Sequence, residues 1–130
     1  MIKAENLCME YGPVKAINNL SCEVKKGEII GLLGPNGAGK STTLKILTTY
    51  VYPTSGNAYI KGKSVKEEAL EVRKMIGYLP EQLPLYNDME VLEYLNFVGN
   101  ARGLFGKKLQ ERLNWVKETC GLKPDRKSVV

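Results

Sequence analysis

The segment from Gly31 to Leu47, "GLLGPNGAGKSTTLKIL", constrains the fold of this chain more than any other. Within it, Gly34 to Ser41 fit the pattern G-x-x-x-x-G-K-[ST], between a continuously apolar stretch and a helix-forming one. Glycines let a backbone wrap closely around phosphate groups, with its N–H groups pointing inward. A helix that begins near Lys40 adds its positive N-terminal end. The sequence therefore predicts a site for a nucleoside phosphate, and an ordinary glycine-rich turn is the alternative.

The residues of this loop have different expected roles. We expect Lys40 to reach the β- and γ-phosphates, and the Ser41 hydroxyl to hold Mg²⁺. The full set of expected nucleotide contacts comprises the loop and the first helical turn: Gly34, Pro35, Asn36, Gly37, Ala38, Gly39, Lys40, Ser41 and Thr42.

The segments around the loop predict an α/β fold. Residues 20–34 read as a strand, a Lys-Lys-Gly turn and a second strand, and the apolar run 28–34 is typical of a strand covered on both faces of a parallel sheet. Apolar residues at helical spacing predict a helix over 40–51, with Pro53 as its stop. A short alternating strand is expected over 57–62.

The middle of the chain predicts one more helix and one more strand. The segment 64–75 reads as a helix in which Ser64 and Glu67 form a Ser-x-x-Glu capping box. The apolar run 76–80 follows as a second buried strand that ends at Pro80.

Beyond Pro80 the pattern becomes helical only. We predict helices over 88–104, with Asp88 as N-cap, and over 107–122, ending at Gly121. This change predicts two parts: a nucleotide-binding α/β core with a β subdomain over 1–84, and a partial helical subdomain over 85–130.

Composition excludes several classes of protein. No apolar run approaches the roughly 20 residues that cross a bilayer, the N-terminus lacks the apolar core of a signal peptide, and the three cysteines have no metal-ligand spacing. The net charge of +5 comes largely from the last quarter, where basic residues alternate with acidic ones. That alternation is typical of a solvated helix face. Attraction to a nucleotide or to an anionic membrane surface is the alternative, and we expect no nucleic-acid partner.

The wording around the loop narrows the family. The stretch "YGPVKAINNLSCEVKKGEIIGLLGPNGAGKSTTLKILTTYVYPTSGNAYIKGKSV" closely resembles the start of an ABC transporter ATP-binding subunit. The continuation, "IGYLPEQLPLYNDMEVLEYLNFVGNARGL", resembles bacterial export-type subunits, including those linked to drug efflux and gliding motility. The resemblance implies a phosphate-loop NTPase core with an antiparallel β subdomain and the start of a helical subdomain. It also implies ATP and Mg²⁺ as ligands, a second ATP-binding subunit, and a membrane-spanning partner at the cytoplasmic face of the cell membrane.

Two further sites follow from the resemblance by position. Tyr11 matches the aromatic residue that stacks on adenine in the family, whereas without the resemblance it reads as a strand-end residue. The family has Gln directly after the Pro of the "IGYLP" segment, where it contacts the metal and the attacking water. This chain has Glu81 there and Gln82 next. Either could coordinate Mg²⁺ through oxygen, and a plain surface Glu–Gln pair is the alternative.

The residues that hydrolyse ATP in the family do not occur in these 130 residues. Hydrolysis in the family needs an Asp–Glu pair at the end of an apolar strand, a Leu-Ser-Gly-Gly-Gln-like segment and a switch histidine. The only aspartates are Asp88 and Asp125, neither of which ends an apolar strand, and there is no histidine. We therefore expect a truncated N-terminal portion of an ATPase subunit that binds ATP but does not hydrolyse it alone.

Two other classes remain open. One is a stand-alone nucleotide-binding module without turnover. The other is a small kinase or GTPase, although a GTPase would need an Asn-Lys-x-Asp-type base reader and none occurs. If the family reading holds, 29–33 and 76–79 are strands of one sheet that are not neighbours, so we predict no direct ladder between them.

Overall fold

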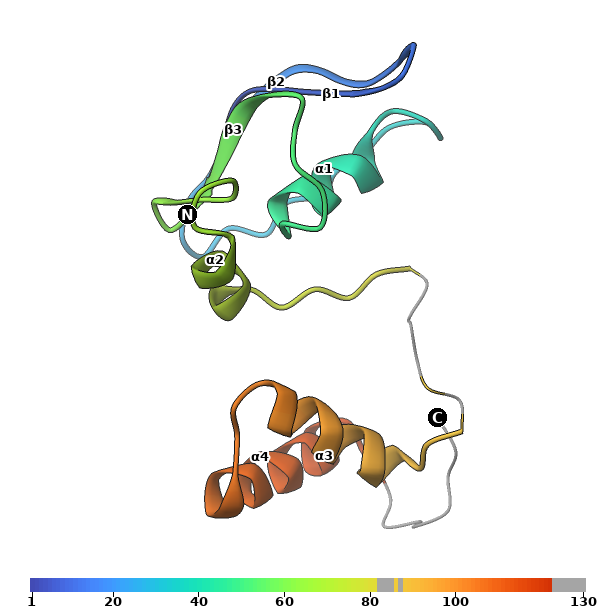
Figure 1. The fold of residues 1–130 in the computed structure, drawn as a ribbon, viewed down its shortest axis with the longest axis vertical. Helices are drawn as coiled ribbons and strands as arrows, with labels where there is room; N and C mark the ends of the chain where they lie inside the picture. Colours follow the sequence, from blue (N-terminus) through green and yellow to red (C-terminus); the bar gives the residue numbers. More distant parts are fainter. Residues whose placement is uncertain (82–85, 87, 123–130) are drawn as a thin grey trace. The chain divides into compact units, whose positions relative to one another are not determined.

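The structure is a computed structural model that describes residues 1–81, 86 and 88–122 (Figure 1). The chain forms two compact units, Met1–Leu79 and Pro80–Val130, each described by itself below. Along the sequence, the division between the units falls a few residues before the predicted boundary between residues 84 and 85. That domain assignment stays a prediction.

The first unit is built on a four-stranded antiparallel sheet in the order β2-β1-β3-β4. Its strands are β1 (Ile2–Tyr11), β2 (Val14–Val24), β3 (Ser55–Ile60) and β4 (Lys63–Ser64). A tight turn pairs Tyr11 with Val14, and Gly12 takes a φ of 57° there, which favours glycine. The predicted strand over 57–62 exists with shifted bounds. The long β1, which the sequence analysis missed, lies at the centre of the sheet.

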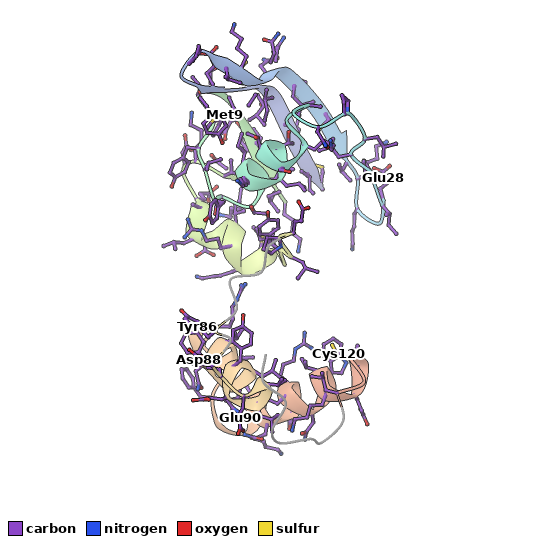
Figure 2. The ribbon with its side chains drawn as sticks, turned by 90° about the vertical axis from the view of Figure 1, so that its right-hand side faces the viewer. Met9, Glu28, Tyr86, Asp88, Glu90 and Cys120 are labelled. Carbon is purple, nitrogen blue, oxygen red and sulfur yellow. The ribbon has the colours of Figure 1, made fainter. Side chains whose placement is uncertain are left out.

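The core of this unit lies between the sheet and helix α1 (Lys40–Leu47), which contacts β2 and β3. Alternate β1 residues such as Leu7 and Met9 face this core, as the period of two along a strand requires. Figure 2 shows the side chains of both units. The buried cluster is Ala4, Leu7, Met9, Ile17, Ile46, Ala58, Ile60, Val65 and Val72.

Helix α1 ends four residues earlier than the predicted end at Val51. Tyr50 N–H donates to the Lys45 carbonyl at 2.8 Å and Thr49 N–H to that of Ile46 at 2.9 Å, the two bonds of a Schellman motif. Thr49 occupies the left-handed position of this motif, with a φ of 61°. Arg73 stabilises it there, because its Nε donates to Thr49 Oγ1 at 2.6 Å. A partly buried tertiary hydrogen bond thus stabilises the end of the helix, which no local pattern signalled.

Helix α2 (Ala69–Met75) is shorter than the predicted helix over 64–75, and its cap differs. Ser64 Oγ accepts from Glu67 N–H at 3.2 Å, as a capping box requires, but the carboxylate that returns to Ser64 N–H belongs to Glu68. Glu68 also pairs with Lys63 at 2.6 Å. The Lys63 ammonium, followed by the Ser64 N–H, lowers the pKa of Glu68 from its ordinary 4.5. The salt bridge between Lys63 and Glu68 therefore favours Glu68 over Glu67 as the residue that closes the cap.

The predicted strands over 28–34 and 76–80 are not strands in the described chain. A strand is defined by hydrogen bonds to a neighbour, and the sheet's ladders include neither segment. Most of their apolar side chains are exposed, with Ile29 at 99% and Leu79 at 80%, whereas Ile76 is partly buried against the core. The absence of a direct ladder between 29–33 and 76–79 is confirmed for these described residues.

The described residues of the second unit form two helices, α3 (Val91–Ala101) and α4 (Gly106–Thr119). Gly99 lets them pack closely, because a Cβ at this position would overlap Leu109 Cδ1. Leu109 and Leu113 form the buried face of α4, as predicted. Gly121, with a φ of 62°, follows the end of α4 as expected. The predicted N-cap Asp88 is wrong, since Glu90 takes that position and helix α3 begins later.

Candidate functional site

The loop between residues 34 and 40 is folded by its glycines. Gly37 and Gly39 both have a φ of 85°, in the left-handed region that side chains disfavour. Ala38 N–H donates to the Pro35 carbonyl at 3.2 Å and closes a turn between them. Consecutive turns of this kind direct backbone N–H groups to one side, which suits an anion.

Gly39 attaches this loop to the sheet. A Cβ at Gly39 would overlap the carbonyl oxygen of Ala16 and lie 3.3 Å from Ile17 Cγ1, both on β2. The glycine is therefore required twice, by its backbone angle and by its contact with β2. Sequence reasoning missed Ala16 and Ile17 as supports of the loop, because only the fold brings them to it.

The N-terminal end of α1 offers donors with no partner inside the helix. The first N–H groups of any helix lack intrahelical acceptors, and at α1 these belong to Lys40, Ser41 and Thr42. No side chain caps this end, and its first turn contains no acidic residue. The next residue, Thr43, turns inward instead, with its hydroxyl donating to the Gly39 carbonyl at 2.9 Å. The arrangement fits a phosphate group as its ligand.

Lys40 adds a full charge to the same place. Its Nζ donates to the carbonyl oxygens of Gly34 at 2.7 Å and Pro35 at 2.6 Å. The ammonium is thus held across the loop by backbone dipoles and makes no ion pair among the described residues. A phosphate would give this cation an anionic partner in place of neutral carbonyls. The structure therefore brings together the predicted set from Gly34 to Thr42.

The other expected site residues are placed less directly. Tyr11 lies at the end of β1 with 47% of its surface exposed, outside the core, and its turn leads into the part of β2 that contacts Gly39. Its stacking role stays a prediction. Glu81 is exposed and belongs to the second unit, whereas Gln82 lies outside the described residues. Their metal-binding role also stays a prediction.

Replacement of Tyr11 by alanine is expected to weaken ATP binding several-fold, since stacking of a base on an aromatic ring contributes about 1–3 kcal/mol. Titration of the variant with ATP measures this. The Tyr52→Ala variant is the control, because Tyr52 is also an exposed tyrosine, at 56%, but lies outside the β1–β2 hairpin that contains Tyr11. Equal ATP affinities of the Tyr11→Ala variant and the original chain would contradict the stacking role.

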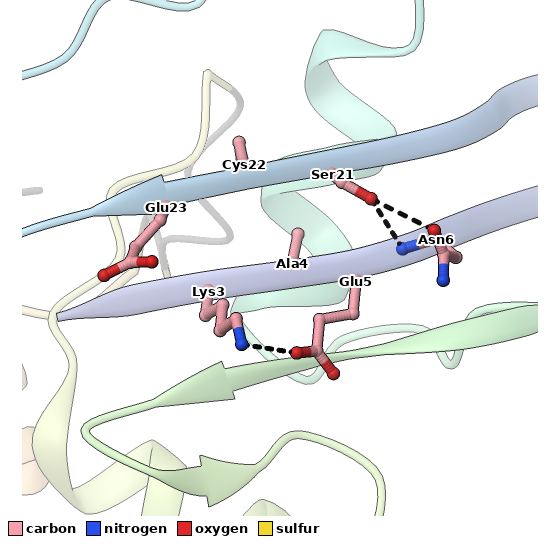
Figure 3. Close-up of a pocket in the computed structure, with 7 residues that line it drawn as sticks. All are labelled: Lys3, Ala4, Glu5, Asn6, Ser21, Cys22 and Glu23. Atoms are coloured by element: carbon pink, nitrogen blue, oxygen red, sulfur yellow. Dashed lines mark hydrogen bonds and ion pairs between the residues drawn. The ribbon is translucent and has the colours of Figure 1, made fainter.

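A separate depression of about 560 Å³ lies on β1 and β2 (Figure 3). Four of its polar side chains already bind one another: Lys3 forms an ion pair with Glu5, and the Ser21 hydroxyl donates a hydrogen bond to Asn6 Oδ1. The Glu5 carboxylate raises the pKa of Lys3, which keeps its positive charge. The mutual pairing makes this depression a weaker ligand site than the loop, whose lysine has only carbonyl partners.

A sequence profile for the family described as ABC transporter matches residues 17–130. The chain belongs to the ABC transporter family of ATP-binding proteins. It is 39% identical over 123 residues to the probable multidrug ABC transporter ATP-binding protein YbhF of Escherichia coli, and 38% identical over 122 residues to the linearmycin resistance ATP-binding protein LnrL of Bacillus subtilis. These matches cover 95% and 94% of this ABC chain, but only 21% and 39% of the relatives.

Solved structures agree with the assignment of this ABC chain. An ATP-binding subunit of an ABC transporter matches with a TM-score of 0.84 and 27% identity, over 99% of this chain and 54% of that one. A dimeric bacterial ABC transporter cassette matches with a TM-score of 0.81 and 26% identity, over 97% of this chain and 60% of that one. The predicted fold class is confirmed: a phosphate-loop ATPase cassette with an antiparallel β part and helices. In the described residues, no helix is long and apolar enough to cross a membrane.

Proposed function

We propose that this chain is the ATP-binding part of an ABC transporter ATPase. One observation carries the proposal: the Lys40 ammonium is held over a loop of left-handed glycines, beside the uncapped N-terminus of α1. A cation and unpartnered backbone donors that converge on one place favour a chain of phosphates over other ligands. Tyr11 is the residue proposed to hold the adenine.

Magnesium ion is the proposed companion of the nucleotide. The Ser41 hydroxyl at the start of α1 would hold it. The described residues contain no cluster of three His, Cys, Asp or Glu side chains that could hold a metal alone. This fits a metal bound mainly through phosphate oxygens, where it neutralises their charge.

The proposed role in the cell is to power export. Relatives named for multidrug transport and for linearmycin resistance support this direction, and the dimeric cassette supports a second ATP-binding subunit as partner. A membrane-spanning subunit would then hold the assembly at the cytoplasmic face of the cell membrane.

Calorimetric titration tests the nucleotide site. Because Lys40 is proposed to contact the β- and γ-phosphates, ATP with Mg²⁺ should bind at least tenfold more tightly than AMP, since one charge-assisted contact contributes about 1.5–3 kcal/mol. Equal affinity for ATP and AMP would contradict the phosphate assignment. No binding of either would contradict the proposed function.

The 130-residue chain by itself is expected to release no phosphate from ATP above background. Positioning without a metal-orienting Asp, a water-polarising Glu and a partner's signature segment leaves the transition-state charge uncompensated. A steady-state assay of phosphate release measures this, with Lys40→Ala as the background control. Release that disappears in that variant would show that the chain has a catalytic carboxylate of its own.

A further inference from the structure

Helix α4 has a basic and aromatic flank that the nucleotide site does not use. Lys108, Arg112 and Trp115, hereafter the α4 stripe, follow the spacing i, i+4, i+7 and so share one flank over about 10 Å. The buried Leu109 and Leu113 face α3 instead. The stripe is therefore a surface separate from the packing face of its helix.

In the part of the chain that the structure describes, neither charge of the stripe has a recorded ion-pair partner. Within residues 88–122, the structure records no ion pair for Lys108 or Arg112, whereas Lys107 lies 3.9 Å from Glu111. By helical spacing, Glu111 lies three residues after Lys108 and four before Trp115, and Glu118 lies three after Trp115, so both carboxylates border the stripe on one side. The solvated-face reading of this basic region holds for the Lys107 side, where the charges alternate, but the stripe itself is uniformly positive.

Trp115 gives the stripe an apolar part. It is the only tryptophan of the chain, and half of its surface is exposed. The Arg112 guanidinium carbon Cζ lies 4.0 Å from the ring centroid, so cation and ring stand together on one flank. An exposed indole beside two cations suits a partner that offers both negative charge and an apolar layer.

We propose that the α4 stripe binds the anionic phospholipid surface of the membrane. Phosphate headgroups accept hydrogen bonds from Lys108 and Arg112, while indole rings favour the headgroup level. A helix flank is convex and suits a broad layer, whereas a bound acidic peptide favours a groove. The depression of about 430 Å³ on this helix does not include the stripe, since it is lined by Asn114, Lys117, Glu118 and Leu122.

The test mixes the full chain with vesicles of phosphatidylglycerol and phosphatidylcholine in about equal parts, and with vesicles of phosphatidylcholine alone. Co-sedimentation gives the partition coefficient, and the emission of Trp115 reports burial of its ring. Each cation close to an anionic surface contributes about fivefold in partition, so the double variant Lys108→Gln, Arg112→Gln should lose roughly 25-fold. The matched control, Lys107→Gln with Lys117→Gln, removes the same charge from the other flank and should lose less than about threefold.

We expect binding to the anionic vesicles only, with a blue shift of the Trp115 emission that is lost at high salt. Equal loss in both double variants, or vesicle binding without a change in emission, would overturn the proposal. Tighter binding of a polyglutamate peptide than of the vesicles would also overturn it, in favour of a protein partner. The inference extends the membrane location in the proposed function, and a parallel ATP titration keeps the two apart, because ATP binding needs the loop and not α4.

Discussion

In the Lys40→Ala variant, affinity for ATP with Mg²⁺ is expected to fall about a hundredfold or more, while the chain stays folded. Among the described residues, the partners of Lys40 Nζ are the carbonyls of Gly34 and Pro35, so its replacement leaves no buried charge unpaired there. What is lost is the contact with the β- and γ-phosphates, and two charge-assisted bonds at about 1.5 kcal/mol each account for this factor. Calorimetric titration measures the affinity, and circular dichroism checks the fold.

Lys45→Ala is the matched control for this experiment. Lys45 is exposed in the last turn of the same helix, so its replacement removes one positive charge from α1 but not from the loop. Its ATP affinity should change less than about threefold, the size of a screened surface charge effect. A folded Lys40→Ala variant that binds ATP as tightly as this control would refute the phosphate site.

The Gly39→Ala variant is expected to lose about 2–4 kcal/mol of stability, and its nucleotide binding with it. Two costs add: a left-handed backbone at a φ of 85°, which costs a side chain about 1–2 kcal/mol, and overlap of the new Cβ with the Ala16 carbonyl on β2. Ala16 lies at an irregularity of the ladder, between the pairs Met9–Ile17 and Glu10–Lys15, so the overlap is relieved only if the backbone shifts between these two pairs. Urea unfolding followed by circular dichroism measures the loss.

Gly37→Ala separates the two costs. Gly37 has the same φ of 85°, but a Cβ there would meet no atom within 4 Å. This variant should therefore show the backbone cost alone, about 1–2 kcal/mol. If both variants lose the same stability, the close contact between Gly39 and β2 contributes nothing to the stability of the chain, and a side chain at position 39 is disfavoured by its backbone angle alone.

The candidate site was largely readable from the sequence because its chemistry is local. Left-handed glycines, a lysine and a helix start within eight consecutive residues, so the spacing G-x-x-x-x-G-K-[ST] already places the donors together. The periodicity of α4 and its glycine stop at Gly121 are local as well, and both were predicted. The resemblance to the family could also be read from the sequence, because the residues of the loop that are specific to the family are consecutive.

Predictions that depended on partners distant in sequence failed. Residues 28–34 and 76–80 have the composition of buried strands, but composition cannot supply the neighbouring strand that makes a ladder. The end of α1 was predicted at Val51. The helix ends earlier, because the hydrogen bond from Arg73 stabilises Thr49 in the left-handed conformation just after α1. The cap of α2 depends on Glu68 and not on Glu67, because Lys63 holds that carboxylate beside Ser64.

The sequence by itself determined the phosphate loop, its lysine and the family of the chain, because these depend on residue types at fixed short spacings. Only the tertiary structure decided what supports the loop: the carbonyl of Ala16 against Gly39, and the central strand β1 that holds β2 in place. The physical reason is that close packing and strand pairing act between segments far apart in the chain, whose contacts carry no local signature.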